Sequence, residues 1–247
     1  MLKVEHLSKA YGSVNAIEDV SFSIEPHTFT AILGESGAGK TTLLRCLTRL
    51  VQPDRGQIWL HGQELTRCSA RELRQLRSQI GVIAQQFNLI DRRTALENCL
   101  AGRLHSLPLW RCLLSYFPPE LLQEGMAALA RVRLLEVAFQ RADQLSGGQQ
   151  QRVAIARALT QRADIILADE PIASLDPASA HLVLGLLRSL CQQEGLTVIC
   201  NLHQTEFAKQ YSDRVLGMRS GKLILDRSTC RLNESDIQNI YSSRKIG

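Results

Sequence analysis

We predict an α/β fold in which a mostly parallel sheet forms the core, with a small antiparallel β subdomain and an inserted helical subdomain. Strand patterns alternate with helical patterns in the second half of the chain, from ADIILAD (163–169) through LTVICNL (196–202) to RVLGMR (214–219). Such alternation is typical of parallel sheets covered by helices. The first sixty residues instead carry short strand patterns separated by turn residues, and residues 68–158 are mostly helical in pattern.

The N-terminal strands come first along the chain. They are KVEHL (3–7), SFSIE (21–25), FTAILG (29–34) and QIWLHG (57–62). FTAILG is apolar on both faces, as a parallel strand covered on two sides should be. The turn residues between the other segments favour small antiparallel strands.

Helical spacing follows the third strand. KTTLLRCLTRL (40–50) has leucines at 43, 44, 47 and 50, which is the spacing of one helix face. The later helical region is interrupted near 85–92 and by a proline-bearing stretch at 108–119. We expect a single domain over 1–247, with the helical subdomain at roughly 86–158 and a short polar tail at 228–247.

Composition excludes several classes of protein. The 247 residues are 45% hydrophobic and 21% charged, with no low-complexity tract, which excludes disordered and fibrous chains. Lys plus Arg number 29 against 24 acidic residues, a net charge of +5 that suits phosphate ligands or an anionic membrane face and does not require nucleic acid. No apolar run approaches the ~18 residues of a membrane span, the first residues are charged, and the seven cysteines form no CxxC pair. We therefore expect a soluble intracellular protein that meets a membrane only through a partner.

A phosphate-binding loop is the strongest chemical signal. GESGAGKT, from Gly34 to Thr41, matches GxxxxGK[ST] and lies between an apolar strand and a helix. Its glycines allow a tight curl whose N–H groups point at phosphate oxygens, and the helix adds its positive N-terminus. Lys40 would reach the β- and γ-phosphates, and the Thr41 hydroxyl would bind Mg²⁺. The alternative, a Gly/Ser-rich connecting turn, is disfavoured by this context, so the sequence predicts a nucleoside triphosphatase with a P-loop core.

Two acidic residues end the strand IILAD. An aspartate at this position, Asp169, would lie beside the phosphate loop and hold Mg²⁺. Side chains alternate along an extended chain, so Glu170 should point elsewhere and accept a proton from the attacking water. The alternative role is a cap for the next helix.

A second motif brings a family resemblance. LSGGQQQRVAIARAL (145–159) resembles the signature of ATP-binding cassette proteins, and it precedes IILADE as in that family. Seven motifs stand in the family's order over nearly the whole chain. The resemblance places these residues at the nucleotide: Tyr11, Gly34, Glu35, Ser36, Gly37, Ala38, Gly39, Lys40, Thr41, Thr42, Ser146, Gly147, Gly148, Gln149 and Asp176. It places Gln85, Glu170 and His203 in catalysis, and Thr41, Gln85 and Asp169 at the Mg²⁺ ion. One departure is Ala84, where a bulky aromatic often precedes the loop glutamine.

The signature also has a physical interpretation. Ser146 can cap the helix that follows, while Gly147 and Gly148 leave its N-terminus open to an anion. The chain already has one phosphate cradle, so it carries two half-sites for the γ-phosphate. The family resemblance implies a head-to-tail homodimer, in which Ser146 and Gly148 of one subunit close on ATP bound by the other.

Two further residues carry roles near the γ-phosphate. His203 follows the apolar strand TVICNL, where a neutral imidazole would hold the attacking water. Gln85 has two plausible functions: binding the metal or water, and reporting the nucleotide state to a neighbouring subunit. After it, the aromatic stretch at 108–119 is either a docking surface or local packing.

The resemblance also suggests a transport function. QQFNLI, the WRCLLSYF insert, LADEPIASLDP and NLHQ together resemble the ATPase subunits of bacterial phosphonate importers. This implies an ATP hydrolase on the cytoplasmic face of the inner membrane, with two integral-membrane permease subunits and a separate solute-binding protein. Phosphite, phosphate or another small solute such as an amino acid remain alternative cargoes. A DNA-repair ATPase is disfavoured because the chain has neither heptads nor CxxC, and a two-cassette translation factor because it has one phosphate loop.

Overall fold

The computed structural model describes residues 1–241, and the last residues of the predicted tail, 242–247, lie outside the described residues. The chain folds into two compact units. Unit 1 consists of Met1–Arg77 together with the chain from Arg188 onward, and unit 2 consists of Ser78–Leu187. The segment predicted as a helical subdomain, 86–158, falls within unit 2.

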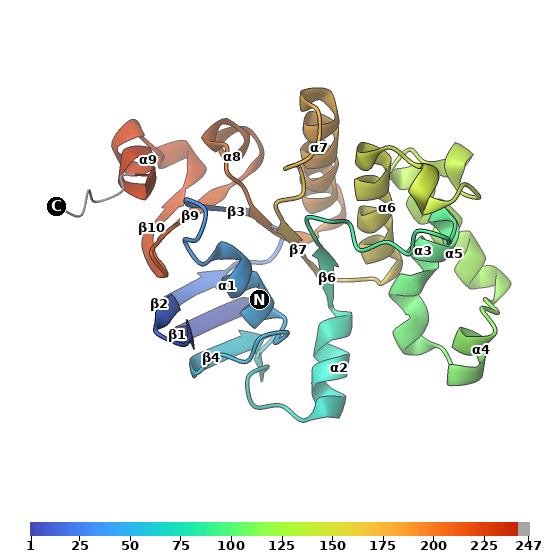
Figure 1. The fold of residues 1–247 in the computed structure, drawn as a ribbon, viewed down its shortest axis with the longest axis horizontal. Coiled ribbons are helices and arrows are strands. Elements are labelled where there is room, and N and C mark those ends of the chain that lie inside the picture. The colour runs from blue at the N-terminus through green and yellow to red at the C-terminus, as the bar shows by residue number, and fades with distance from the viewer. Residues whose placement is uncertain (242–247) are drawn as a thin grey trace. The chain divides into compact units, whose positions relative to one another are not determined.

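An antiparallel sheet forms one layer of unit 1 (Figure 1). Its strands lie in the order β2-β1-β4-β5. They span Leu2–Tyr11 (β1), Val14–Ile24 (β2), Arg55–Leu60 (β4) and Gln63–Glu64 (β5). β1 pairs antiparallel with both β2 and β4, and alternate side chains such as those of Leu2 and Val4 are buried, as a half-covered sheet requires. The predicted antiparallel subdomain is therefore confirmed.

Unit 1 also contains parallel strands. β3 (Phe29–Leu33) lies between β8 (Thr197–Asn201) and β9 (Arg214–Arg219) and is parallel to both. All five residues of β3 are buried, which explains its continuous apolar run. β10 (Lys222–Ser228) then returns antiparallel beside β9. The helices assigned to unit 1 are α1 (Lys40–Leu47), most of α2 (Ala70–Ser78), α8 (Thr205–Tyr211) and α9 (Glu234–Tyr241).

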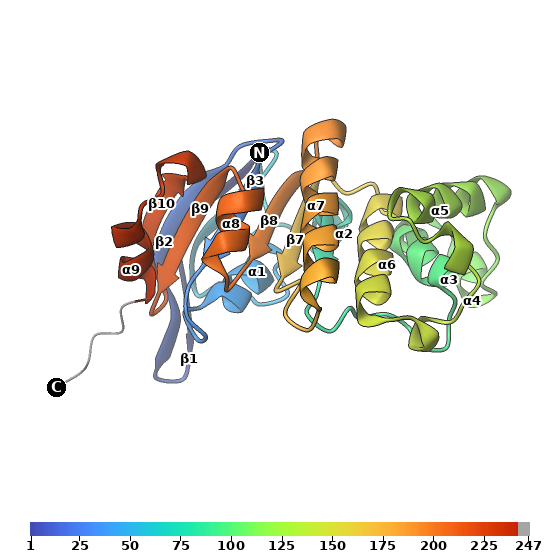
Figure 2. The same ribbon diagram turned by 90° about the horizontal axis from the view of Figure 1, so that it is seen from above.

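Unit 2 is mostly helical, around one parallel strand pair. β6 (Ile80–Ile83) pairs with β7 (Ile165–Asp169). The helices are α3 (Ala95–Leu100), α4 (Leu109–Leu113), α5 (Pro119–Arg131), α6 (Gly147–Thr160) and the start of α7 (Pro177–Glu194). α3, α5 and α6 pack on one another (Figure 2). Gly125 permits this packing, because a Cβ there would lie 2.8 Å from Leu96 and Leu100 side chains. Within the described chain, no helix combines the length and apolar character that crossing a bilayer requires.

Two parts of the predicted element order are wrong. β6 lies in the stretch that we assigned to helices, because four residues are too few to show a period. The predicted tail contains the end of β10 and all of α9. This polar segment folds because Ile240 is fully buried and Asp236 pairs with Arg227 at 2.7 Å.

Candidate functional site

The glycine-rich loop of unit 1 curls between the end of β3 and the start of α1. Gly39 adopts φ +102°, and a Cβ there would lie 2.2 Å from the Ala16 carbonyl oxygen. At Gly34, a Cβ would lie 2.4 Å from the Met218 carbonyl oxygen. Any side chain at these two positions would force the neighbouring strands apart. The loop conformation therefore explains why the sequence pattern has glycine at these two positions.

Lys40 is the first residue of α1 and only 5% exposed. Its Nζ donates to the carbonyl oxygens of Gly34 at 2.7 Å and Glu35 at 3.1 Å. These bonds hold the ammonium at the loop. They also replace the hydrogen bonds with water that the buried ammonium has lost. The first turn of the α1 helix ends with the bond from Leu43 N–H to Gly39 at 2.8 Å, so the positive end of the helix lies at the same loop. Thr41 and Thr42 stand in this turn and are half-buried.

Tyr11 ends β1 at the turn of the β1–β2 hairpin. Tyr11 is 49% exposed, and the Lys9 Nζ lies 5.5 Å from its ring centroid. Asp54 fixes this end of the strand, because it pairs with Lys9 at 2.7 Å and accepts from the Ala10 N–H at 2.8 Å. The bond from Lys9 holds the pKa of the Asp54 carboxyl below its usual range. The result is an exposed aromatic face on a fixed strand, which suits base stacking.

His203 also belongs to unit 1. It follows β8, whose five residues are all buried, and it is itself exposed just before α8 begins at Thr205. Its carbonyl oxygen accepts a hydrogen bond from the Tyr241 hydroxyl at 2.8 Å. The buried strand and this bond hold the backbone on the two sides of His203.

The acidic pair lies in unit 2 at the end of β7. Asp169 is the last strand residue, and Glu170 adopts φ +51°, a left-handed conformation that is uncommon outside glycine. The Ala173 N–H donates to the Glu170 carbonyl at 3.2 Å and closes the turn. The alternation predicted for an extended chain therefore does not continue to Glu170. The strand ends at Asp169, and Glu170 begins a turn in the left-handed conformation.

Gln85 follows β6 in an exposed turn of unit 2. Phe87 and Asn88, which come next, have φ values of +58° and +49°. Arg157 of α6 holds this turn by donating to the Asn88 carbonyl at 2.6 Å and to the Phe87 carbonyl at 3.1 Å. Burial lowers the pKa of the Arg157 guanidinium. Arg157 was not among the predicted site residues, although its position inside the signature helix was a signal.

The start of α6 has the cap that the sequence predicts. Ser146 accepts from the Gln149 N–H at 3.3 Å, and the Gln149 side chain accepts from the Ser146 N–H at 2.8 Å, which completes a capping box. Gly148 lies against Ser179, whose Oγ would be 3.0 Å from an added Cβ. Asp176 accepts from the Ser179 N–H at 3.0 Å, and its bonds with Ser179 lower its pKa. Gly148 and Asp176 therefore both contact Ser179, which lies in the first turn of α7.

The predicted nucleotide-binding and catalytic residues are thus divided between the two units. Unit 1 carries Tyr11, the loop from Gly34 to Thr42, and His203. Unit 2 carries Gln85, the capped start of α6 at 146–149, Asp169, Glu170 and Asp176.

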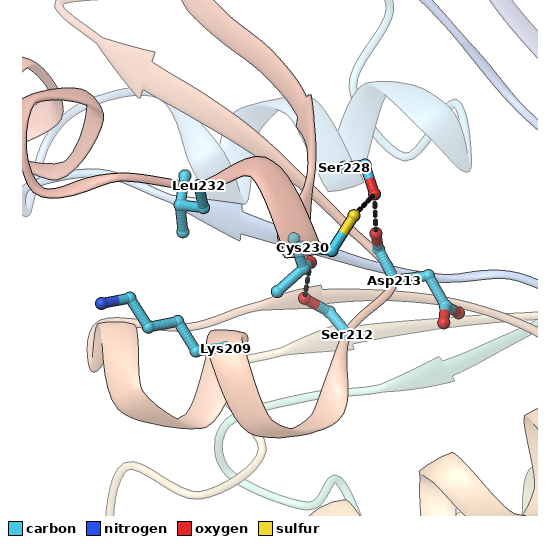
Figure 3. A pocket seen from close by; sticks show the side chains of 7 residues that line it. Lys209, Ser212, Asp213, Ser228, Cys230 and Leu232 are labelled. Atoms are coloured by element: carbon cyan, nitrogen blue, oxygen red, sulfur yellow. Dashed lines mark hydrogen bonds between the residues drawn. The ribbon is translucent and has the colours of Figure 1, made fainter.

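A shallow pocket of about 610 Å³ opens elsewhere in unit 1 (Figure 3). It is lined by Lys209, Ser212, Asp213, Ser228, Thr229, Cys230 and Leu232. The Ser212 and Thr229 hydroxyls bond each other at 3.1 Å, and Ser228 donates to the Asp213 carbonyl at 3.3 Å. These hydroxyls bond within the wall, and the pocket contains none of the predicted nucleotide residues.

The aromatic insert forms α4 and the turn after it, in unit 2. Trp110 and Tyr116 stack with ring centroids 6.2 Å apart, and the Arg111 guanidinium lies 5.1 Å from the Trp110 centroid. Leu109 and Leu113 remain 74% and 75% exposed. The two rings therefore stack on each other but remain exposed, as do the aliphatic side chains.

Comparison with known proteins assigns the family. The family model described as ABC transporter matches residues 17–173. The chain belongs to the ABC transporter family. As a member of this family it carries a nucleotide-binding ATPase domain, which agrees with the phosphate loop and the capped signature helix.

Within the ABC transporter family, the chain is similar to proteins with a named transport function. The chain is 47% identical to the phosphonates import ATP-binding protein PhnC 2 of Rhodopseudomonas palustris (strain BisB18), covering 98% of this chain and 89% of the relative. It is 45% identical to the phosphonates import ATP-binding protein PhnC 1 of Ruegeria sp. (strain TM1040), covering 98% and 95%.

Solved ABC cassettes share the fold. One is the ATP-binding cassette MJ0796, a dimer in a post-hydrolysis state bound to ADP and Pi. It is 32% identical, with a TM-score of 0.80 over 93% of this chain and 99% of that chain. Another is cbiO1 from Clostridium perfringens, part of the transporter complex cbiONQ, at 26% identity and a TM-score of 0.83 over 96% and 92%. The predicted fold class, a mostly parallel α/β core with an antiparallel sheet and a set of helices, is thus confirmed.

Proposed function

We propose that this chain is the ATP-hydrolysing subunit of a bacterial importer for phosphonates. The observation that carries the proposal is the sequence identity of 42–47%, over at least 98% of the chain, to proteins named as phosphonates import ATP-binding proteins. The phosphate loop also supports the proposal, because the carbonyl oxygens of Gly34 and Glu35 hold the Lys40 ammonium at the loop. ATP binding and hydrolysis on this chain would power movement of the solute.

Phosphate binding is assigned to the loop and the first turn of α1. The Lys40 ammonium, now bonded to two carbonyls, would exchange these partners for β- and γ-phosphate oxygens. The backbone from Gly34 to Gly39 and the N-terminus of α1 would stabilise the remaining negative charge. The exposed Tyr11 ring would stack on the adenine base.

The residues assigned to Mg²⁺ have the right chemistry. Thr41, Asp169 and Gln85 offer a hydroxyl, a carboxylate and an amide oxygen, and Mg²⁺ prefers oxygen ligands. When bound, the ion would neutralise charge on the phosphates. Glu170 would accept the proton of the attacking water, and the His203 imidazole would orient that water and contact the phosphate.

The proposed assembly contains two copies of this chain. The capped start of α6, with Ser146, Gly147 and Gly148, would close on ATP bound by the other copy, with Gln149 in the capping box and Asp176 beside it. Two integral-membrane permease subunits and a separate solute-binding protein would complete the importer at the cytoplasmic face of the inner membrane. ATP would hold the two copies together, and hydrolysis would release them.

A growth experiment tests the proposed solute. Strains that lack the gene, or carry Glu170→Gln in its place, are grown with methylphosphonate, phosphite, phosphate or an amino acid as the limiting nutrient. The host must metabolise each phosphorus source. We expect loss of growth on methylphosphonate alone. A defect confined to phosphite, phosphate or the amino acid would reject the phosphonate assignment while retaining the ATPase.

A further inference from the structure

The C-terminal helix α9 reaches the nucleotide half-site of unit 1 through Tyr241. The Tyr241 hydroxyl donates to the carbonyl oxygen of His203 at 2.8 Å, across 38 positions of sequence. Nothing in the sequence patterns placed Tyr241 at the site, because it falls in the segment that we predicted as a polar tail.

The electrostatic surroundings of the same phenol include the start of the phosphate loop. Burial raises the pKa of Tyr241, while a hydrogen bond from the Gly34 backbone opposes this shift, and the negative charges of Glu206 and Glu35 add to it. Gly34 opens the loop, and its carbonyl holds the Lys40 ammonium. The hydroxyl thus contacts the backbone at His203, close to the start of the loop.

α9 is firmly attached to unit 1, so Tyr241 has a fixed position. Asn233 and Asp236 bond each other's N–H groups at 2.9 and 3.1 Å and cap the helix. Asp236 pairs with Arg227 at 2.7 Å, and Arg219 donates to the Asn239 carbonyl at 2.6 Å. The Ile240 side chain, next to Tyr241, is fully buried.

We infer that Tyr241 is a positioning residue, which fixes the backbone of His203 within unit 1. This inference rests on the proposed function of His203 in orienting the attacking water. Because α9 is fixed to unit 1 by its own contacts, the hydroxyl that it carries holds the His203 carbonyl in place. A displacement of His203 by a fraction of an ångström would misplace the water while leaving the phosphate contacts of Lys40 in place.

The test is Tyr241→Phe, which keeps the ring and its packing and removes only the hydroxyl. Steady-state ATP hydrolysis by the full chain is measured with purified wild type and variant. We expect kcat to fall by about 3- to 10-fold, the loss typical of one hydrogen bond, while KM for ATP changes by less than about 2-fold. The thermal midpoint of unfolding should fall by no more than about 4 °C, because the packing of the ring is retained and only one hydrogen bond is lost.

Tyr116→Phe is the matched control, since it removes an exposed phenol hydroxyl of unit 2. It should leave kcat, KM and the unfolding midpoint unchanged. An unchanged kcat in Tyr241→Phe would overturn the inference. So would a fall in kcat accompanied by a proportional rise in KM and a lower unfolding midpoint, because that pattern indicates general loosening of unit 1. Absence of ATP hydrolysis by the wild type would reject the proposed function itself.

Discussion

Glu170 combines an uncommon backbone conformation with the proposed role of proton acceptor. A non-glycine residue at φ +51° costs on the order of 1–3 kcal/mol, and the turn closed by the Ala173 N–H maintains it. The buried Pro171 that follows fixes the chain on the other side. The conformation is therefore determined by its neighbours, and a glutamine at this position should adopt it as well.

Glu170→Gln is predicted to separate ATP binding from hydrolysis. The amide keeps the shape of the side chain but cannot accept a proton, so turnover should fall by at least about 100-fold. ATP binding, measured by equilibrium dialysis, should persist, and a dimer should elute from a sizing column in the presence of ATP.

Glu136→Gln is the control, because Glu136 is exposed in unit 2 and lies outside the proposed site. It should hydrolyse ATP at the wild-type rate. Turnover by Glu170→Gln at that same rate would contradict the general-base assignment.

α6 shows how one helix connects two motifs of unit 2. Its first turn is the capping box of Ser146 and Gln149, and Arg157 near its other end holds the turn after Gln85. Phe87 also approaches the start of the helix, 3.8 Å from where a Gly147 Cβ would lie. The signature and the glutamine turn are therefore parts of one hydrogen-bonded and packed arrangement.

Replacing Arg157 should destabilise this arrangement. In Arg157→Ala the carbonyls of Phe87 and Asn88 lose a charged donor, so the free energy of unfolding in urea should fall by about 2–3 kcal/mol. The control is Arg141→Ala, which removes an exposed ion pair with Asp143 and should change it by less than about 1 kcal/mol. Equal losses in the two variants would refute a special role of Arg157.

The helices, strands and turns differ in how well they could be predicted from the sequence. The strand β3, the loop from Gly34 and the start of α1 were predictable, because glycines, an apolar run and leucine spacing all act locally. The cap at Ser146 was predictable for the same reason. β6 and α9 were not, since a four-residue strand has no readable period, and α9 depends on burial of Ile240 and the pairing of Asp236 with Arg227. The left-handed Glu170 and the contact of Tyr241 with His203 likewise depend on tertiary structure.

At the scale of the whole molecule, the predicted nucleotide residues are divided between two units of the chain. Unit 1 carries the phosphate loop, and unit 2 carries the signature and the acidic pair. Similarity to a solved cassette described as dimeric supports the proposed head-to-tail assembly. In such a dimer each ATP needs the loop of one copy and the signature of the other.

Mixing two inactive variants tests this assembly. Lys40→Ala removes the phosphate contact, and Ser146→Arg places a bulky cation at the start of α6, so each homodimer should be inactive. A heterodimer of the two retains one intact composite site. ATPase activity should therefore reappear on mixing, at no more than about half of the wild-type rate. Full recovery, or no recovery despite heterodimer formation, would contradict the head-to-tail model.

The most direct test of the central claim is uptake of radiolabelled methylphosphonate by cells that carry the wild-type gene, Glu170→Gln or no copy. We predict accumulation with the wild type alone, and competition by unlabelled phosphonates but not by an amino acid. Equal accumulation in all three strains, with the host's other uptake systems deleted, would contradict the assignment of this ABC cassette to phosphonate import.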